Sequence, residues 1–232
     1  MIRLLLVLAA SIALLAVVGL VHGDYPVPLG EVLGALAGDP AVPAQVSLIV
    51  TELRLPRLVL AVLVGLALGV AGTLSQAVMR NPLAEPGLLG INAGAGLAAM
   101  VVLVGVKGVS DTWLPAASFV GAAVMALAIM LLSWRGGTSS IRIILIGIGL
   151  SSLGGAATSF LTAFGDVRDV QRAMVWLAGS VYDGTWSKVE ALLLWSVPCY
   201  VFVWMSAREL DTIGFGDDTA RSLGQRSTSC AA

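Results

Sequence analysis

The chain has 232 residues, of which 58% are hydrophobic types and only 12% are Asp, Glu, Lys or Arg. A soluble domain carries roughly 25% charged residues, so a globule of this composition could not cover its surface with solvated groups. The net charge of −1, two cysteines and one histidine also exclude a nucleic-acid binder, a disulfide framework and a cysteine-based zinc site. The mean hydropathy of +0.95 instead indicates helices packed in lipid.

Gaps between successive charges locate the expected spans, because a membrane-crossing helix needs about 20 mostly apolar residues. Lipid offers no partners for backbone polar groups, and the period-two alternation of barrel strands is missing. The predicted fold class is therefore all-α, a polytopic transmembrane helix bundle. We expect the first stretch to be a retained helix rather than a signal peptide, because it is long for one. The six uncharged stretches are 4–23, 58–79, 86–106, 112–134, 143–165 and 191–207.

The distribution of basic residues leaves the orientation open. With a cytoplasmic N-terminus and six spans, seven basic residues lie inside and six outside, which is almost no positive-inside bias. Two outside pairs, Arg54 with Arg57 and Arg168 with Arg172, run against the usual rule. Either the orientation is inverted, or these arginines have a function outside.

Two polar connections separate the spans. Residues 23–53 form a long loop in which Leu29 to Leu36 is compatible with a short helix at the interface. Residues 166–190 are the most polar stretch between spans. Within them, 173–182 are too short to cross lipid and form either a partly inserted helix or the start of the last span.

Three motifs admit both a functional and a structural interpretation. Small residues at every fourth position from Ala61 to Thr73 form a stripe for helix packing or for a pathway. In 79–96, two prolines and an asparagine predict a rigid polar turn before a glycine-rich helix. Two guanidiniums in 54–57, at the mouth of a helix, suit either carboxylate pairing or lipid headgroups.

The remaining features of the sequence are a polar tail and the absence of catalytic and phosphate-binding motifs. Within 211–225, Asp217 to Thr219 are suited to capping a short helix that ends at Gly224, which is either a handle for a soluble partner or a frayed tail. No set of side chains suggests catalysis, a metal or a cofactor, and G-x-x-x-x-G-K-[ST] is absent. We therefore expect no enzyme activity and no ATPase site of its own.

Residues 54–96, RLPRLVLAVLVGLALGVAGTLSQAVMRNPLAEPGLLGINAGAG, strongly resemble the membrane permeases of iron–siderophore and cobalamin ABC importers. The shared pattern is RxPR, a small-residue helix with Gly72 and Gln76, and then NPLAxPxxLG. Segments 138–152, 175–186 and 214–224 resemble later blocks of that family.

The resemblance implies a permease subunit that carries ferric siderophores or related chelates by alternating access, or else cobalamin or haem. Its implied partners are a cytoplasmic ATP-binding subunit, an extracytoplasmic substrate-binding protein, a second permease copy (as a homo- or heterodimer) and membrane lipid, with no nucleic acid. The implied location is a bacterial inner membrane with the N-terminus in the cytoplasm. Which chelate is carried does not follow from the motifs.

The resemblance also assigns roles to single residues. Arg54 and Arg57 would dock the binding protein, and Gly65, Gly69 and Gly72 would pack helices. The cytoplasmic gate would consist of Asn81, Pro82, Leu83, Ser139 and Ser140. The segment that couples to the ATPase would comprise Gly216, Asp217, Asp218, Thr219, Ala220, Arg221, Ser222, Leu223 and Gly224.

The end of the sequence departs from the family pattern. Its six stretches of about 20 residues compare with roughly ten spans expected for the family. We expect 1–225 to be a partial permease domain and 226–232 an atypical tail of the kind a frameshift produces. An inactive fragment is therefore an alternative to an active permease.

Overall fold

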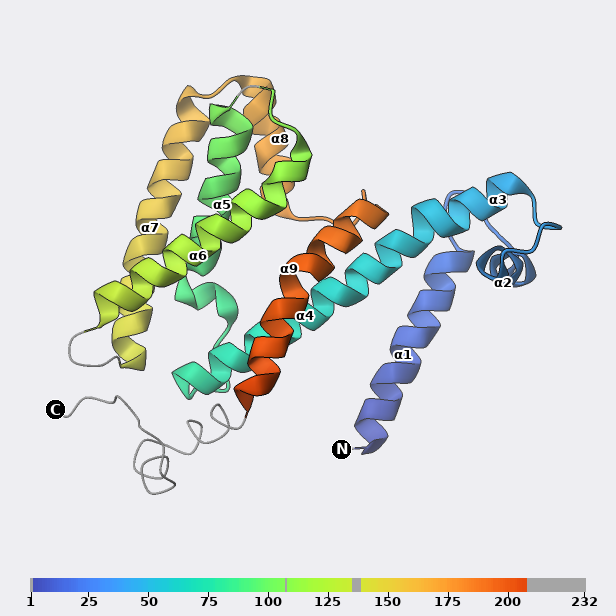
Figure 1. The fold of residues 1–232 in the computed structure, drawn as a ribbon, viewed down its shortest axis with the longest axis horizontal. Helices are drawn as coiled ribbons and strands as arrows, with labels where there is room; N and C mark the ends of the chain where they lie inside the picture. The colour runs from blue at the N-terminus through green and yellow to red at the C-terminus, as the bar shows by residue number, and fades with distance from the viewer. Residues whose placement is uncertain (1, 107, 135–138, 208–232) are drawn as a thin grey trace. The chain divides into compact units, whose positions relative to one another are not determined.

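The computed structural model describes residues 2–106, 108–134 and 139–207, which are helical with no strand in these ranges (Figure 1). This confirms the predicted all-α class. Within the described residues, five helical segments are long and apolar enough to cross a membrane. They are Ile2–Val21 (α1), Ala44–Met79 (α3 to α4), Leu114–Ser133 (α6), Ser140–Phe164 (α7) and Trp186–Met205 (α9).

The third uncharged stretch gives a shorter helix than the prediction of six full-length spans required. Its apolar helix is Ile91–Gly105, made of α5 (Ile91–Met100) and a π-helical turn, η3 (Val101–Gly105). The start is delayed because Pro86 opens a 3₁₀ turn, η2 (Pro86–Leu89), which Gly90 ends with a φ of 82°. At 1.5 Å per residue, such a helix is about 22 Å long, against a hydrocarbon core of about 30 Å.

The chain divides into two compact units. The first comprises Met1–Leu66 with Ser180–Leu193, and the second comprises Ala67–Gly179 with Leu194–Ala232, within the described residues. α4 (Leu55–Met79) and α9 contribute residues to both units.

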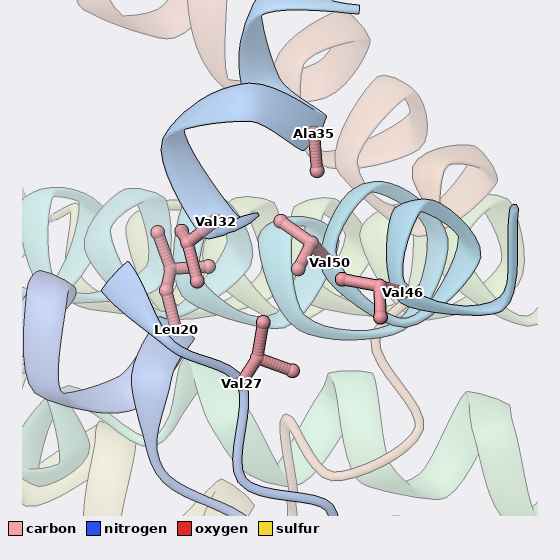
Figure 2. Packing of buried hydrophobic residues seen from close by; sticks show 6 residues of the cluster. All are labelled: Leu20, Val27, Val32, Ala35, Val46 and Val50. Carbon is pink, nitrogen blue, oxygen red and sulfur yellow. The ribbon is translucent and has the colours of Figure 1, made fainter. Parts of the chain in front are cut away.

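A small apolar core in the first unit joins the end of α1 to two short helices. α2 (Leu29–Ala37) confirms the predicted short helix. It is followed by α3 (Ala44–Leu48) and a π-helix, η1 (Ile49–Arg54), that runs directly into α4. Since residues three or four apart share a helix face, α2 and the 44–54 segment each turn a pair of apolar residues inward. The buried cluster is Leu20, Val27, Val32, Ala35, Val46 and Val50 (Figure 2).

The second unit packs α5, α6 and α7 through glycines (Figure 1). A Cβ atom at Gly94 of α5 would lie 2.5 Å from the carbonyl oxygen of Gly121 in α6. A Cβ at Gly90 would lie 2.5 Å from the carbonyl oxygen of Gly147 in α7. Small residues thus let these backbones touch, as is common between helices in lipid.

The amphipathic helix α8 (Val167–Ala178) follows α7 in the second unit. The side chain of Asp166 caps it by accepting from the backbone N–H of Arg168 at 3.0 Å, and Gly179, with φ 73°, ends it. Ala173 of α8 is buried beside Met100 and Leu103. Residues 173–182 are therefore not the start of the last span, because α8 ends before a separate α9 begins.

Candidate functional site

The motif RLPR lies inside a continuous helical segment, not at the mouth of a helix as the sequence suggested. The helix begins at Ala44, and a π-helical register over Ile49–Arg54 ends where Leu55 donates to the carbonyl of Val50. Pro56 has no N–H, so it cannot donate to the carbonyl of Thr51 as the π-helical register would require. The carbonyl of Thr51 instead accepts a hydrogen bond from Nε1 of Trp186, at 3.1 Å.

The guanidinium of Arg54 is bound to the end of α1. Its Nη1 donates to the carbonyl oxygens of Leu20 and Val21, at 2.5 Å and 3.3 Å, and its Nη2 donates to the carbonyl of Tyr25. The last carbonyls of a helix have no partner within the helix and carry the negative end of its dipole. Arg54 therefore closes the C-terminus of α1 and fixes the turn that follows.

Arg57 lies one helical turn further on, in a different environment. Its guanidinium carbon is 4.7 Å from the ring centroid of Tyr182, a cation–π distance. Its Nε is buried and has no hydrogen-bond partner among the described residues. Gly184 makes this arrangement possible, because a Cβ there would lie 2.9 Å from the Cα of Arg57.

These side chains line a hollow of about 570 Å³ in the first unit. Both arginines, two tyrosines and the histidine of the chain contribute, together with a single acidic residue. The lining therefore favours an anionic group over a cationic one. The polar lining residues are His22, Asp24, Tyr25, Arg54, Arg57 and Tyr182.

The chain turns after α4, as the prolines and asparagine predicted, and side chains bond across the turn. The side chain of Asn81 accepts from the backbone N–H of Leu83 at 2.9 Å, and Nε2 of Gln76 donates to the carbonyl of Pro82 at 3.0 Å. Arg80 has a φ of 49°, which turns the chain sharply at the helix end. The side chain of Leu83 is 87% exposed, so this turn presents an apolar residue without a covering neighbour in the described residues.

The second predicted gate segment contacts the last turn of α4. Ser139 caps α7 by accepting from the N–H of Arg142 at 3.3 Å, and the hydroxyl of Ser140 donates to the carbonyl of Val78 at 3.1 Å. The structure thus brings the ends of α4 and α7 together. The chain between these two ends runs through α5 and α6.

The predicted packing glycines have no packing partner in the described part of the chain. Cβ atoms at Gly65, Gly69 and Gly72 would each find no heavy atom within 4 Å outside their own helix backbone. The packing role stays a prediction, and any partner for this stripe lies outside the described residues.

A second hollow, of about 370 Å³, lies at the start of α8 in the second unit. Its charged lining is Asp166, Arg168, Asp169 and Arg172, with apolar residues from Val102 to Leu114. Two acids and two bases leave no net charge, so the lining does not select an ion of either sign.

Two further predictions concern coupling and metals. The coupling segment Gly216–Gly224 lies outside the described residues. Among the residues that the structure describes, no group of three or more His, Cys, Asp or Glu is placed to hold a metal ion.

Comparison with known proteins gives one family and several relatives. The family described as the FecCD transport family matches residues 9–231. The iron-uptake system permease protein FeuC of Bacillus subtilis is 40% identical over 227 residues, covering 93% of this chain and 67% of FeuC. The achromobactin transport system permease protein CbrC of Dickeya dadantii is 41% identical over 224 residues, covering 96% of this chain and 62% of CbrC.

A solved structure agrees in fold. It is described as an inward-facing conformation of a metal-chelate type ABC transporter and superposes with a TM-score of 0.83 at 23% identity. The match covers 97% of this chain and 69% of that one. The chain thus spans about two thirds of the length of the proteins it matches.

Proposed function

The chain belongs to the FecCD transport family, and we propose from this premise that it acts as the membrane permease subunit of an ATP-driven importer of ferric siderophores or related iron chelates. The observation that carries the proposal is the family match over 9–231, together with two relatives near 40% identity that are named as permeases of iron uptake and achromobactin transport. Cobalamin and haem are the alternative cargoes.

The proposed topology places the N-terminus in the cytoplasm of a bacterial cell with the chain crossing the inner membrane several times. α1 then ends outside, where Arg54, Arg57 and Tyr182 meet. α4 returns inside, where its last turn at Val78 bonds Ser140 at the start of α7. The two pairs of contacts support this arrangement, because each joins segments that the topology assigns to the same side.

Each end then has a proposed partner. The cationic hollow at Arg54 and Arg57 would receive an acidic patch of a substrate-binding protein, since guanidinium and carboxylate groups pair in a forked geometry. The turns at Asn81–Leu83 and Ser139–Ser140 would form the cytoplasmic gate. Gly216–Gly224 would transmit movement from a separate ATP-binding subunit, because the chain carries no phosphate-binding loop of its own.

Alternating access would follow from a two-state arrangement of these ends. A ligand or nucleotide shifts such an equilibrium only through a difference in its affinity for the two states. The binding protein would favour the state that is open outside, and closure of the ATP-binding subunits would change which side is open. A second permease copy would complete the pathway, and the open stripe at Gly65, Gly69 and Gly72 is a candidate surface for packing.

An uptake experiment tests this proposal. The full chain is expressed with the ATP-binding subunit and binding protein of its own transport system in a bacterium that lacks the corresponding permease. Radioactive iron is supplied as single siderophores, ferric citrate or haem, and radioactive cobalamin is supplied separately. ATP-dependent uptake of one of these is expected, and a catalytically dead ATP-binding subunit is the control. Insertion in normal amounts without uptake of any cargo would overturn the proposal in favour of an inactive fragment.

A further inference from the structure

We infer that the two arginines of RLPR have different roles: Arg54 is a positioning residue that locks the end of α1, and Arg57 alone offers its charge to a partner. This inference rests on the proposed docking of a binding protein at this end, and it divides between the two residues a role that the motif assigns to both. It follows from how the donors of each guanidinium are used.

Three of the five N–H donors of Arg54 are engaged by backbone carbonyls. Three hydrogen bonds link it to Leu20, Val21 and Tyr25, which lie 29 to 34 residues earlier in the chain. A hydrogen bond that involves a charged group contributes more than a neutral one, and the carbonyls of Leu20 and Val21 form the negative end of α1. A partner that drew this guanidinium away from α1 would leave these carbonyls without a donor.

The turn after α1 is shaped around this guanidinium. A Cβ atom at Gly23 would lie 2.8 Å from Nη2 of Arg54. The obstacle is the far end of a flexible side chain, so a methyl group at Gly23 would displace the guanidinium rather than the backbone. A further hydrogen bond stabilises the same turn. The N–H of Val27 donates at 3.1 Å to the Val21 carbonyl that Arg54 also binds.

The positive charge of Arg57 is not neutralised by a neighbouring group in the described part of the chain. No carboxylate pairs with it among the described residues, and its buried Nε has no acceptor there. The ring of Tyr182 supports one face of the guanidinium and fixes its direction without neutralising it. A carboxylate from a partner is the group that would pair with this charge.

The support behind Arg57 is itself fixed to the helix. The indole of Trp186 bonds Thr51, and Gly184 lies against the backbone of Arg57. The 180–186 turn therefore holds Tyr182 in place from two points. Arg57 is thus presented on a prearranged surface, which lowers the entropic cost of binding.

Two measurements on the full chain in lipid nanodiscs test the inference. Amide hydrogen exchange is followed at His22 and Val27, whose N–H groups bond Val18 and Val21 at 2.8 and 3.1 Å. The rates at which phenylglyoxal modifies Arg54 and Arg57 are measured by peptide mass spectrometry, with and without a polyglutamate peptide.

The exchange measurement separates the two arginines. Arg54→Gln should speed exchange at both amides about tenfold, and Arg54→Lys should restore part of the protection. Gly23→Ala should act like Arg54→Gln while leaving Arg54 in place, which covers the case in which Arg54→Gln does not fold. Arg57→Gln should change exchange less than about twofold, since no charged bond to α1 is lost. Gly30→Ala is the matched glycine control, because its methyl group would find nothing within 4 Å.

The modification measurement tests the charge itself. Arg57 should react about tenfold faster than Arg54, whose guanidinium bonds three backbone carbonyls. Polyglutamate should slow the reaction of Arg57 only, and added salt should remove this protection. Unchanged exchange in both Arg54→Gln and Gly23→Ala, or equal reactivity and protection of both arginines, would overturn the inference. Neither measurement involves transport, so a failed uptake experiment would count against the proposed function alone.

Discussion

Replacing Gly94 by alanine would push α5 and α6 apart. The added Cβ would lie 2.5 Å from the carbonyl oxygen of Gly121 and 2.5 Å from the Cβ of Met125. The contact is reciprocal, because a Cβ at Gly121 would meet the carbonyl of Gly94 and the Cβ of Ala98. Both obstacles are backbone or Cβ atoms, so no change of rotamer relieves them.

The expected loss of stability follows from how far α5 and α6 have to separate. Ordinary van der Waals contact begins at 3.4 Å, so the 2.5 Å approaches have to lengthen along the whole contact. Overpacking a core costs about 1–3 kcal/mol. Helices in lipid associate through close packing rather than through a hydrophobic driving force, so separation loses most of what holds the pair. We therefore expect a loss of about 2–3 kcal/mol, which is roughly 30- to 150-fold in the unfolding equilibrium.

Unfolding in bicelles, followed by circular dichroism or steric trapping, measures this loss. The matched controls are Gly149→Ala and Gly155→Ala in α7, because a methyl group at either position would meet nothing within 4 Å. Alanine is the better helix former, so these variants should be unchanged or up to about 1 kcal/mol more stable. If Gly94→Ala unfolds at the same point as the two controls, the close contact between α5 and α6 is not as described.

Three further predictions concern the two ends of the bundle. Ser140→Ala should lower the free energy of unfolding by about 1 kcal/mol, with Ser152→Ala, which bonds only within its own helix, as the control; equal losses would contradict the link between α4 and α7. Trp186→Phe should cost about 1–3 kcal/mol by leaving a carbonyl unpaired, and hydrogen exchange that is unchanged at 180–186 would contradict it. With both native cysteines replaced by serine, an impermeant maleimide should label Tyr25→Cys but not Leu83→Cys in spheroplasts; the reverse pattern would invert the topology.

Much of the helical architecture was predictable because lipid rejects unpaired charges. The uncharged stretches 58–79, 112–134 and 143–165 correspond closely to most of α4, α6 and α7. The last stretch, 191–207, began too late, because α9 starts at Trp186 and includes Lys188 and Glu190 in its first turns. Charged side chains near a helix end can extend to water, so the gap between charges underestimates such a helix.

The predicted loop over 23–53 is wrong for its last part, because a continuous helical segment begins at Ala44. Glu52 and Arg54 interrupt the apolar run, so the gap rule could not extend α4 backwards. Val46 and Val50 of this segment are buried together with Val27 and α2. This burial stabilises a helix that the spacing of charges does not reveal. An apolar pair four residues apart was the available signal, but two residues are too few to identify a helix.

The roles of the two arginines could not be predicted from spacing, because their partners are far away in the sequence. The motif alone left carboxylate pairing and lipid headgroups as equal alternatives. The carbonyl of Leu20 is 34 residues from Arg54, and the segment holding Tyr182 follows more than a hundred residues after Arg57. Side chains with the same chemistry thus acquire different environments through tertiary contacts that no local pattern encodes.

Pro56 links these observations. A proline inside a helix normally costs about 3 kcal/mol, because it removes a hydrogen bond and crowds the preceding turn. Here the helix before Pro56 has a π-helical register. The carbonyl of Thr51 accepts a hydrogen bond from the indole of Trp186, 135 residues away. The same turn presents Tyr182 to Arg57, while Arg54 binds the end of α1. The start of α4 is thereby tied to the 180–186 turn through Trp186 and Tyr182, and to α1 through Arg54. Loss of the indole bond should therefore loosen the support of Arg57 by Tyr182 and leave the bond of Arg54 to α1 in place.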